Sequence, residues 1–230
     1  MTDQIEKSEP KLLDQRFFER PVEVVAPDLI GCYLFTTVGG HRVGGLIIET
    51  EAYDGNDPAA HCHPEASQRR RARSDAMLLS GGHAYVHEDR KMPCLNLTCD
   101  RESFCSAVLI RALFPCEGIE TMTRRRGAHR DADKRIKERK GNYTRLLCNG
   151  PSKVGEALGI AVEFNKRSLF ELPFEIRAKD EASILLNGPR VNIKKGVEVA
   201  WRWGHRDYTE YLSYPRFETR SEGLNAPPAS

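Results

Sequence analysis

Apolar and β-branched residues dominate two neighbouring stretches of the chain, residues 32–38 and 42–53, which predicts two β-strands. Gly39-Gly40 lies between them and favours a tight hairpin turn. Shorter stretches of the same kind predict three more strands, at 83–87, 94–98 and 107–112.

Helices are expected where apolar residues recur every three or four positions and capping residues mark the ends. A polar stretch at 54–74, rich in Asp, Pro, His, Ser and Arg, predicts a long loop, and loops of this length are often functional. The predicted helices are 16–20, one from Pro21 to Gly31, 117–126, the highly charged 130–140, and one that begins at 150–153 and stops at Gly159.

The predicted strands come in adjacent runs and do not alternate strictly with helices. This order predicts a single domain of mixed α/β class, with a largely antiparallel curved sheet and flanking helices. Residues 1–15 are expected to form a flexible N-terminal segment, 16–214 the domain, and 215–230 a disordered tail.

Composition is consistent with one globular domain, because 40% of the 230 residues are hydrophobic and 30% are charged. The net charge of +2 neither requires nor excludes a nucleic-acid partner. No apolar stretch is long enough to cross a bilayer, and residues 1–15 lack the apolar core of a signal peptide, so we expect a cytoplasmic protein. Its seven cysteines are then expected to be reduced thiols.

The segment that carries the most chemistry is the end of the second strand. Alternate positions of a strand share a face, so Glu49, Glu51 and Tyr53 are expected on one side, just before the long loop. Two carboxylates and an aromatic ring there could form a catalytic site. The alternative is a solvated polar edge, because exposed acids are common.

Two other patterns bear on function. His61, Cys62 and His63 could suggest a Cys/His metal site, but the remaining cysteines do not lie at a zinc-site spacing, so no metal is expected. Three basic clusters predict a phosphate-binding surface, namely Arg69-Arg70-Arg71 with Arg73, Arg90-Lys91, and Arg124-Arg125-Arg126.

An ordered series of segments from about Phe17 to Trp203 resembles the alkyladenine (3-methyladenine) DNA glycosylase family. The series includes Glu49-Thr50-Glu51-Ala52-Tyr53, Ala59-Ala60-His61, Gly82-His83-Ala84-Tyr85-Val86, Cys94-Leu95-Asn96, Val108-Leu109-Ile110-Arg111, Gly150-Pro151-Ser152-Lys153 and Pro189-Arg190-Val191-Asn192-Ile193. The resemblance implies base-excision repair, in which an alkylated or deaminated purine is flipped out of DNA and its N-glycosidic bond is hydrolysed.

The resemblance also implies roles for individual residues. Glu51 matches the general base that activates a water for attack on C1′ of the sugar, and Arg111 matches the arginine that fixes this water and a nearby phosphate. Tyr53 matches one wall of the base pocket, which stacks on the flipped base, and His61 matches a polar contact to the purine edge. Asn96 matches the side chain that disfavours an exocyclic amino group, and Val191 a position whose carbonyl holds the water.

The chain departs from the family pattern at 86–93, where an aromatic-rich stretch is expected. His87 stands at the position of a stacking tyrosine, and Arg90 stands near the position of the wedge that fills the gap in the duplex. Met92 and Pro93 could take over the insertion, because apolar side chains kink DNA elsewhere. The residues expected to bind DNA are Arg73, Arg90, Lys91, Met92, Pro93 and Lys153.

No lysine falls at a matched active-site position, so the resemblance implies a monofunctional enzyme without strand cleavage. It implies that the enzyme needs no cofactor and is a monomer. The implied partner is damaged DNA, which we expect to be duplex, and a bacterial protein of this kind would be associated with the nucleoid. Two alternatives stay open. The chain could be a DNA-binding relative with weak or no glycosylase activity, or a helix-hairpin-helix glycosylase, to whose hairpin residues 149–155 are similar.

Overall fold

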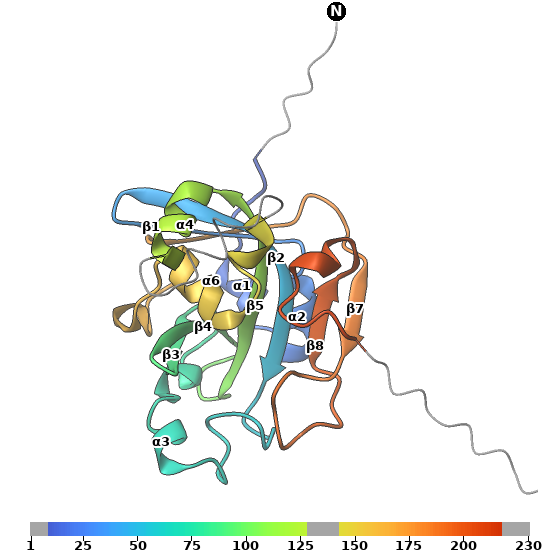
Figure 1. The fold of residues 1–230 in the computed structure, drawn as a ribbon. Helices are drawn as coiled ribbons and strands as arrows, with labels where there is room; N and C mark the ends of the chain where they lie inside the picture. The colour runs from blue at the N-terminus through green and yellow to red at the C-terminus, as the bar shows by residue number, and fades with distance from the viewer. Residues whose placement is uncertain (1–8, 128–142, 218–230) are drawn as a thin grey trace, which may run out of the picture.

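The computed structural model describes residues 9–127 and 143–217 of the chain. These residues fold around a single eight-stranded sheet (Figure 1). The strand order is β3-β4-β5-β2-β1-β6, with β8 paired to β2 and β7 paired to β8. The strands are β1 Tyr33–Val38, β2 His41–Tyr53, β3 Ala84–Asp89, β4 Met92–Cys99, β5 Ser106–Glu117, β6 Phe174–Arg177, β7 Leu185–Gly188 and β8 Arg202–His205. All the pairings among these strands are antiparallel.

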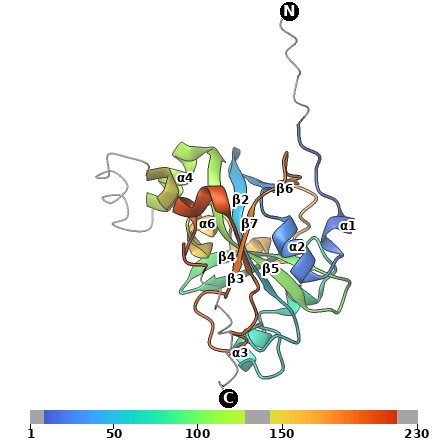
Figure 2. The same cartoon turned by 90° about the vertical axis from the view of Figure 1, so that its right-hand side faces the viewer.

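Strand β2 occupies the centre of the sheet. Its first half pairs with β1, its second half pairs with β8, and β5 pairs with it on the other edge. In the view of Figure 2, α1 and α2 lie to the right of β2 and β5, and α4 and α6 lie to their left. The apolar side chains of α2 and α6 nevertheless meet in one core. The predicted class, a mixed α/β domain with an antiparallel curved sheet and flanking helices, is confirmed.

Helices α1, α2, α4 and α6 lie close to predicted ones, whereas the short helix α3 falls within the stretch that was predicted to be a loop. The helices are α1 Gln15–Phe18, α2 Val22–Asp28, α3 Gln68–Arg71, α4 Ile119–Gly127 and α6 Pro151–Leu158, with 3-10 turns η1 Asp75–Leu78, η2 Tyr143–Leu146, η3 Val162–Phe164 and η4 Arg206–Tyr211. Helix α6 begins with Pro151 and ends at Gly159, whose φ of 73° is left-handed, as the sequence predicted. The helix predicted at 130–140 lies outside the described residues.

Apolar side chains of α2 and α6 contribute to one main core. Val22, Val25 and Ala26 of α2 are buried there, as are Val154 and Leu158 of α6. Each of these valine and leucine side chains contributes about 1.5–3 kcal/mol when it leaves water. The other face of β2 is covered by the segment from η4 onward, since Ile48 clusters with Leu212, and Tyr208, Tyr211 and Phe217 pack against them. Because both faces are covered, most of β2 beyond Arg42 is buried, rather than every second residue.

The helix-hairpin-helix alternative is wrong. Residues 149–155, which suggested it, enter α6, and α6 packs on β4 and β5 of the sheet. Gly155 allows the close approach, because a Cβ there would lie 2.0 Å from the carbonyl oxygen of Pro93 in β4. None of the helices within the described ranges is long and apolar enough to cross a membrane.

Both ends of the described chain contact the sheet. The Leu13 amide donates to the Ile176 carbonyl over 2.9 Å, and the Phe217 ring lies 3.8 Å from the Arg202 guanidinium carbon. Residues assigned by the sequence to a flexible segment and to a tail therefore include some that make ordered contacts. The limits of the domain at 16 and 214 stay a prediction.

The expectation of seven reduced thiols is wrong for one pair. Cys62 and Cys105 form a disulfide, whereas Cys32, Cys94, Cys99, Cys116 and Cys148 are free. The bond joins the long loop after β2 to the start of β5. Reasoning from the cellular compartment could not detect it, because two cysteines 43 residues apart are brought together only by the fold.

Candidate active site

Glu49, Glu51 and Tyr53 lie on one face of β2, as the alternation predicted. Both carboxylates are 0% exposed, so the alternative of a solvated polar edge is wrong. An ionised carboxylate without water is stable only when it is paired and hydrogen-bonded. The surroundings of the two acids must therefore supply donors and positive charge.

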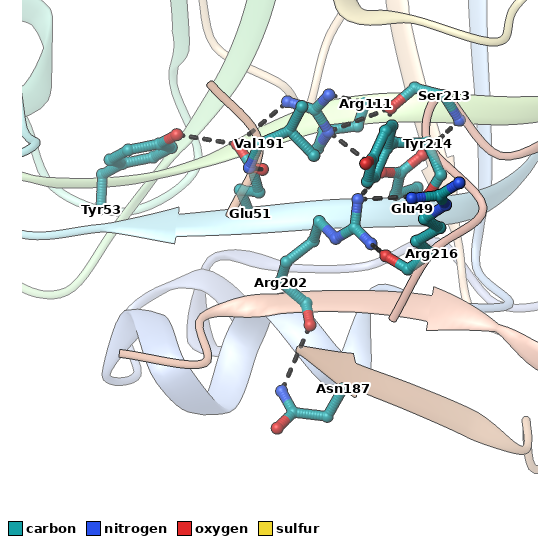
Figure 3. Close-up of polar contacts among 10 residues, drawn as sticks. All are labelled: Glu49, Glu51, Tyr53, Arg111, Asn187, Val191, Arg202, Ser213, Tyr214 and Arg216. Atoms are coloured by element: carbon teal, nitrogen blue, oxygen red, sulfur yellow. Dashed lines mark hydrogen bonds and ion pairs between the residues drawn. The ribbon is translucent and has the colours of Figure 1, made fainter. Parts of the chain in front are cut away.

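Three donors orient the Glu51 carboxylate (Figure 3). The Val191 amide donates to Oε1 over 2.7 Å, the Tyr53 hydroxyl donates to Oε2 over 2.7 Å, and Arg111 Nη1 donates to Oε2 over 3.0 Å. These donors come from β2, β5 and the loop that precedes β8, and they fix both oxygens. The sequence had assigned a role to the carbonyl of Val191, whereas the contact in the structure is through its amide.

Arg111 reaches the two acids from a β-bulge. Glu49 pairs with Ala112 and Thr50 with Ile110, so Arg111 has no partner on β2 and is the extra residue of β5. Bulges redirect side chains, which explains how one arginine contacts Glu49 and Glu51 together. Burial alone lowers the pKa of Arg111, but the charges of Glu51 and Glu49 outweigh burial and raise the pKa above its ordinary value.

Glu49 lies behind Arg111 and completes a buried cluster of charges. Its Oε1 accepts from Arg111 Nε over 3.0 Å and from Arg202 Nη1 over 3.4 Å. Arg202 of β8 is itself 0% exposed and was not singled out by the sequence. Two carboxylates face two guanidinium groups, so the cluster with Glu51 carries no net charge.

A cavity of about 930 Å³ opens in front of Glu51. Many of the predicted site residues line it, namely Glu51, Tyr53, His61, Arg73, His87, Arg90, Asn96, Arg111 and Val191. The structure therefore brings the predicted catalytic pair and the predicted pocket residues together around one space, although they come from distant parts of the sequence.

One wall of the cavity is a cluster of rings from the long loop and from β3. His61 Nδ1 lies 2.7 Å from the Tyr85 hydroxyl, and the rings of His61 and His87 meet edge to face with centroids 4.7 Å apart. Asn96 Nδ2 donates to the Tyr85 carbonyl over 3.1 Å and lies 3.2 Å from His87 Nδ1. Because a carbonyl only accepts, this contact fixes which atom of the Asn96 amide is nitrogen.

Both histidines of this wall are neutral near pH 7. Burial, followed by the charges of Arg70 and Arg73, lowers the pKa of His61 to about 4. Burial, followed by His61 and Arg73, lowers the pKa of His87 to about 3. The wall therefore presents uncharged rings beside a rim of arginines.

Residues 86–93, where the chain departs from the family pattern, form the end of the β3–β4 hairpin. Arg90 and Lys91 are its turn, with φ of 50° and 68°, and both are exposed. Met92 and Pro93 line a second hollow of about 340 Å³, together with Arg125 and Glu156. Lys91, Met92 and Pro93 thus lie outside the lining of the main cavity.

Lys153 also lies away from the main cavity. Its Nζ donates to Asn149 Oδ1 over 2.7 Å, one turn earlier, and it is half-buried. The cavity is instead lined by Pro151 and Ser152 at the start of α6.

A metal centre has no support in the described ranges, since no three His, Cys, Asp or Glu side chains gather there in a way that could hold an ion. Residues 61–63, whose pattern suggested a metal site, make other contacts. Cys62 is in the disulfide and His61 contacts Tyr85.

Comparison with known proteins decides the family. Residues 16–209 match the methylpurine-DNA glycosylase (MPG) family, which covers most of the chain. The chain belongs to the methylpurine-DNA glycosylase family. The predicted family and the prediction of a DNA glycosylase, a hydrolase of N-glycosyl bonds that acts in DNA repair, are confirmed.

Individual relatives agree over nearly their full length. A protein of Rhodopseudomonas palustris (strain BisB5) is 40% identical over 196 residues, which cover 85% of this chain and 87% of the relative. Proteins of Rhizobium meliloti and Bradyrhizobium diazoefficiens are 41% and 38% identical, and the matches cover 83% and 89% of this chain and 91% and 92% of those relatives. All three are provisionally named 3-methyladenine DNA glycosylases.

The glycosylase site contains a buried ion pair that the sequence did not reveal. Arg190 forms an ion pair with Asp57, and its guanidinium carbon lies 4.7 Å from the centre of the Tyr53 ring. Arg190 also donates to the carbonyls of Ala52 and Gly196. The pair ties the loop after β2 to the loop that carries Val191, and so holds two of the groups that orient Glu51.

Other parts of the glycosylase cavity were also missed. Tyr85 was noted only within a matched segment, and the basic residues Lys194 and Lys195 of the rim were not singled out. The cluster at 124–126, by contrast, is partly structural, because Arg125 donates to the carbonyls of Ala157 and Val38 and Arg126 pairs with Glu156. Each of these contacts joins distant segments, so local sequence patterns carry no signal for them.

Proposed function

We propose that this glycosylase removes alkylated or deaminated purines from DNA by hydrolysis, with Glu51 as the general base that activates the attacking water. The observation that carries the proposal is the state of the Glu51 carboxylate, which is buried, ionically paired and at the wall of the cavity. A carboxylate offers about four acceptor positions. Donors within the described residues take three of them, which leaves one on Oε1 for a water.

The base would enter the cavity after leaving the stack, because its glycosidic bond cannot be reached inside a duplex. Tyr53 and the His61–Tyr85–His87 cluster then offer aromatic faces on which a purine can stack. Alkylated purines are often cationic, and an aromatic wall with neutral histidines attracts a cation without opposing it by charge. Asn96 lies at this wall, where its amide can disfavour the exocyclic amino group of guanine.

Duplex DNA is the proposed partner of the rim around the cavity. Arg69, Arg70, Arg73, Arg90 and Lys194 line the cavity, so a phosphate backbone drawn across its mouth would meet several positive charges. The exposed turn at Arg90-Lys91, followed by Met92, is the part of the hairpin that could enter the gap in the duplex. Pro93 is a poorer wedge, because its carbonyl packs on Gly155 of α6.

Water, and not a lysine amine, is the proposed nucleophile. The lysines that line the cavity are Lys194 and Lys195 at its rim, and Lys195 pairs with Glu65 over 2.8 Å. A Schiff base with the sugar would need an amine at C1′. The enzyme is therefore proposed to be monofunctional and to leave an abasic site in an intact strand.

A lesion-release assay tests this function. The protein is incubated with duplex and single-stranded oligonucleotides that carry hypoxanthine, 1,N6-ethenoadenine or 3-methyladenine, and both the freed base and the strand are measured. We expect the free base, an abasic strand that breaks only on treatment with alkali, and no cross-link on treatment with borohydride. Retained DNA binding with no base released from any of these substrates would favour the alternative, a DNA-binding relative without glycosylase activity.

A further inference from the structure

Ser213 connects the two buried carboxylates of the site through Arg111 (Figure 3). Its hydroxyl accepts from Arg111 Nη2 over 2.8 Å and from Nε over 3.2 Å, and it donates to Glu49 Oε1 over 2.9 Å. A hydroxyl has one donor and two acceptor positions, so all of its capacity is used. The Ser213 amide also donates to Glu49 Oε2 over 2.6 Å.

We propose that Ser213 is a positioning residue of the active site, which holds the Arg111 guanidinium so that Nη1 stays on Glu51. This inference rests on the proposed role of Glu51. It assigns a part in the reaction to the segment after η4, which lies 102 residues from Arg111 and 164 from Glu49 in the sequence.

The geometry of arginine explains why a hydroxyl is needed there. The guanidinium is a planar fork whose outer edge can pair with a carboxylate through two parallel hydrogen bonds. In this site the Nε and Nη2 atoms are held by Glu49 and Ser213, and only Nη1 is directed at Glu51. Without the hydroxyl, the guanidinium is free to tilt toward either acid, and the position of the Glu51 carboxylate is less well defined.

The segment that carries Ser213 is fastened by Arg202. Arg202 Nη1 donates to the Tyr214 carbonyl over 3.2 Å, Nη2 donates to the Arg216 carbonyl, and the Phe217 ring covers the guanidinium. Arg202 also contacts Glu49, so the acid that holds Ser213 is itself held by the residue that anchors the segment. Arg202 therefore holds both the segment that carries Ser213 and the carboxylate that accepts from its hydroxyl, before substrate binds.

The test compares Ser213→Ala, which removes the hydroxyl, with Ser213→Thr, which keeps one, in single-turnover base release from a hypoxanthine duplex. We expect Ser213→Ala to lower the rate constant by about 10- to 100-fold, as small misplacements of catalytic groups do. Its affinity for the duplex should stay within about threefold of wild type, because Ser213 does not line the cavity. Ser213→Thr should keep most of the rate. Thr209→Ala, at an exposed position of η4, is the matched control and should resemble wild type.

The conservative variant separates positioning from a merely structural role. A hydroxyl at position 213 should keep the rate near that of wild type, whereas a role in stability alone would lower the rate and the melting temperature together. A wild-type rate in Ser213→Ala would overturn the proposal. So would an equal loss of rate and of melting temperature in Ser213→Ala and Ser213→Thr, because the hydroxyl would then not matter. If Glu51→Gln is fully active, the proposed function itself fails, whatever the Ser213 variants do.

Discussion

Tyr53 and Glu51 lie two residues apart on β2, and the phenol of Tyr53 donates a 2.7 Å hydrogen bond to Glu51 Oε2. The ring of the same tyrosine lines the cavity and packs beside Arg190. One side chain thus links the wall of the proposed base pocket to the carboxylate that we propose activates water.

The substitution Tyr53→Phe separates these two roles, because it removes the hydroxyl and keeps the ring. A hydrogen bond to a charged group is worth about 1.5–3 kcal/mol, so we expect a loss of about tenfold or more in the single-turnover rate with unchanged duplex affinity. Tyr33→Phe is the matched control, since Tyr33 lies on β1 and its hydroxyl donates to Asp180, and neither residue lines the cavity. Equal rates in wild type and Tyr53→Phe would remove the hydroxyl from the mechanism.

The buried pair of Arg190 and Asp57 should matter for stability as well as for activity. Removal of one partner leaves an uncompensated charge, so Arg190→Met is expected to lower the free energy of unfolding by about 3–5 kcal/mol. Lys195→Met breaks an exposed pair with Glu65 and should leave the free energy of unfolding close to that of wild type. Urea unfolding measures both. Similar losses in the two variants would show that the ion pair of Arg190 and Asp57 does not hold the two loops together.

Local patterns were sufficient to predict the centre of the site. Gly39-Gly40 gave the β1–β2 hairpin, and the period of a strand placed Glu49, Glu51 and Tyr53 on one face. The contacts that hold these side chains could not be predicted in this way. Asp57 and Arg190 are 133 residues apart, and the bulge at Arg111 depends on how β5 pairs with β2.

Stability is expected to fall in mild acid because of the two cavity histidines. Burial, the first cause for both, lowers the pKa of His61 to about 4 and that of His87 to about 3, whereas an unfolded histidine titrates near 6.5. Above about pH 6.5 both states are neutral and nothing is lost. As the pH falls below that value, the unfolded chain binds protons that the folded chain does not, and the free energy of unfolding declines toward pH 4. Urea unfolding at several pH values should show a shallower decline in His87→Gln, and an unchanged decline would contradict this account.

His87 is also the position where this chain departs from the family pattern, because the imidazole is smaller than the phenol ring of the expected tyrosine. A phenol offers a larger stacking surface, so His87→Tyr is expected to tighten binding to a duplex that carries 1,N6-ethenoadenine, by about three- to tenfold. His41→Tyr, at the exposed first position of β2, controls for the addition of a tyrosine. Weaker binding in His87→Tyr would mean that His87 does not stack on the flipped base.

The hairpin that carries His87 shows why this part of the site was the hardest to predict. Two-residue hairpin turns usually contain Gly or Asn, which adopt positive φ easily. Here Arg90 and Lys91 form the turn with positive φ, so the sequence gives no turn signal, and the start of β4 at Met92 could not be predicted from it. The pairing of Glu88 with Pro93 and of Asp89 with Met92 is visible only in the folded chain.

The most direct test of the central claim is single-turnover base release by Glu51→Gln, measured beside its affinity for the same lesion-bearing duplex. Loss of the general base should lower the rate constant by about 10²- to 10⁴-fold. Glutamine keeps the shape of the side chain, so duplex affinity should stay within about tenfold, or about 1.4 kcal/mol, of wild type. Glu163→Gln, at an exposed position of η3, should behave as wild type in both respects. Full base release by Glu51→Gln would contradict the role assigned to this carboxylate.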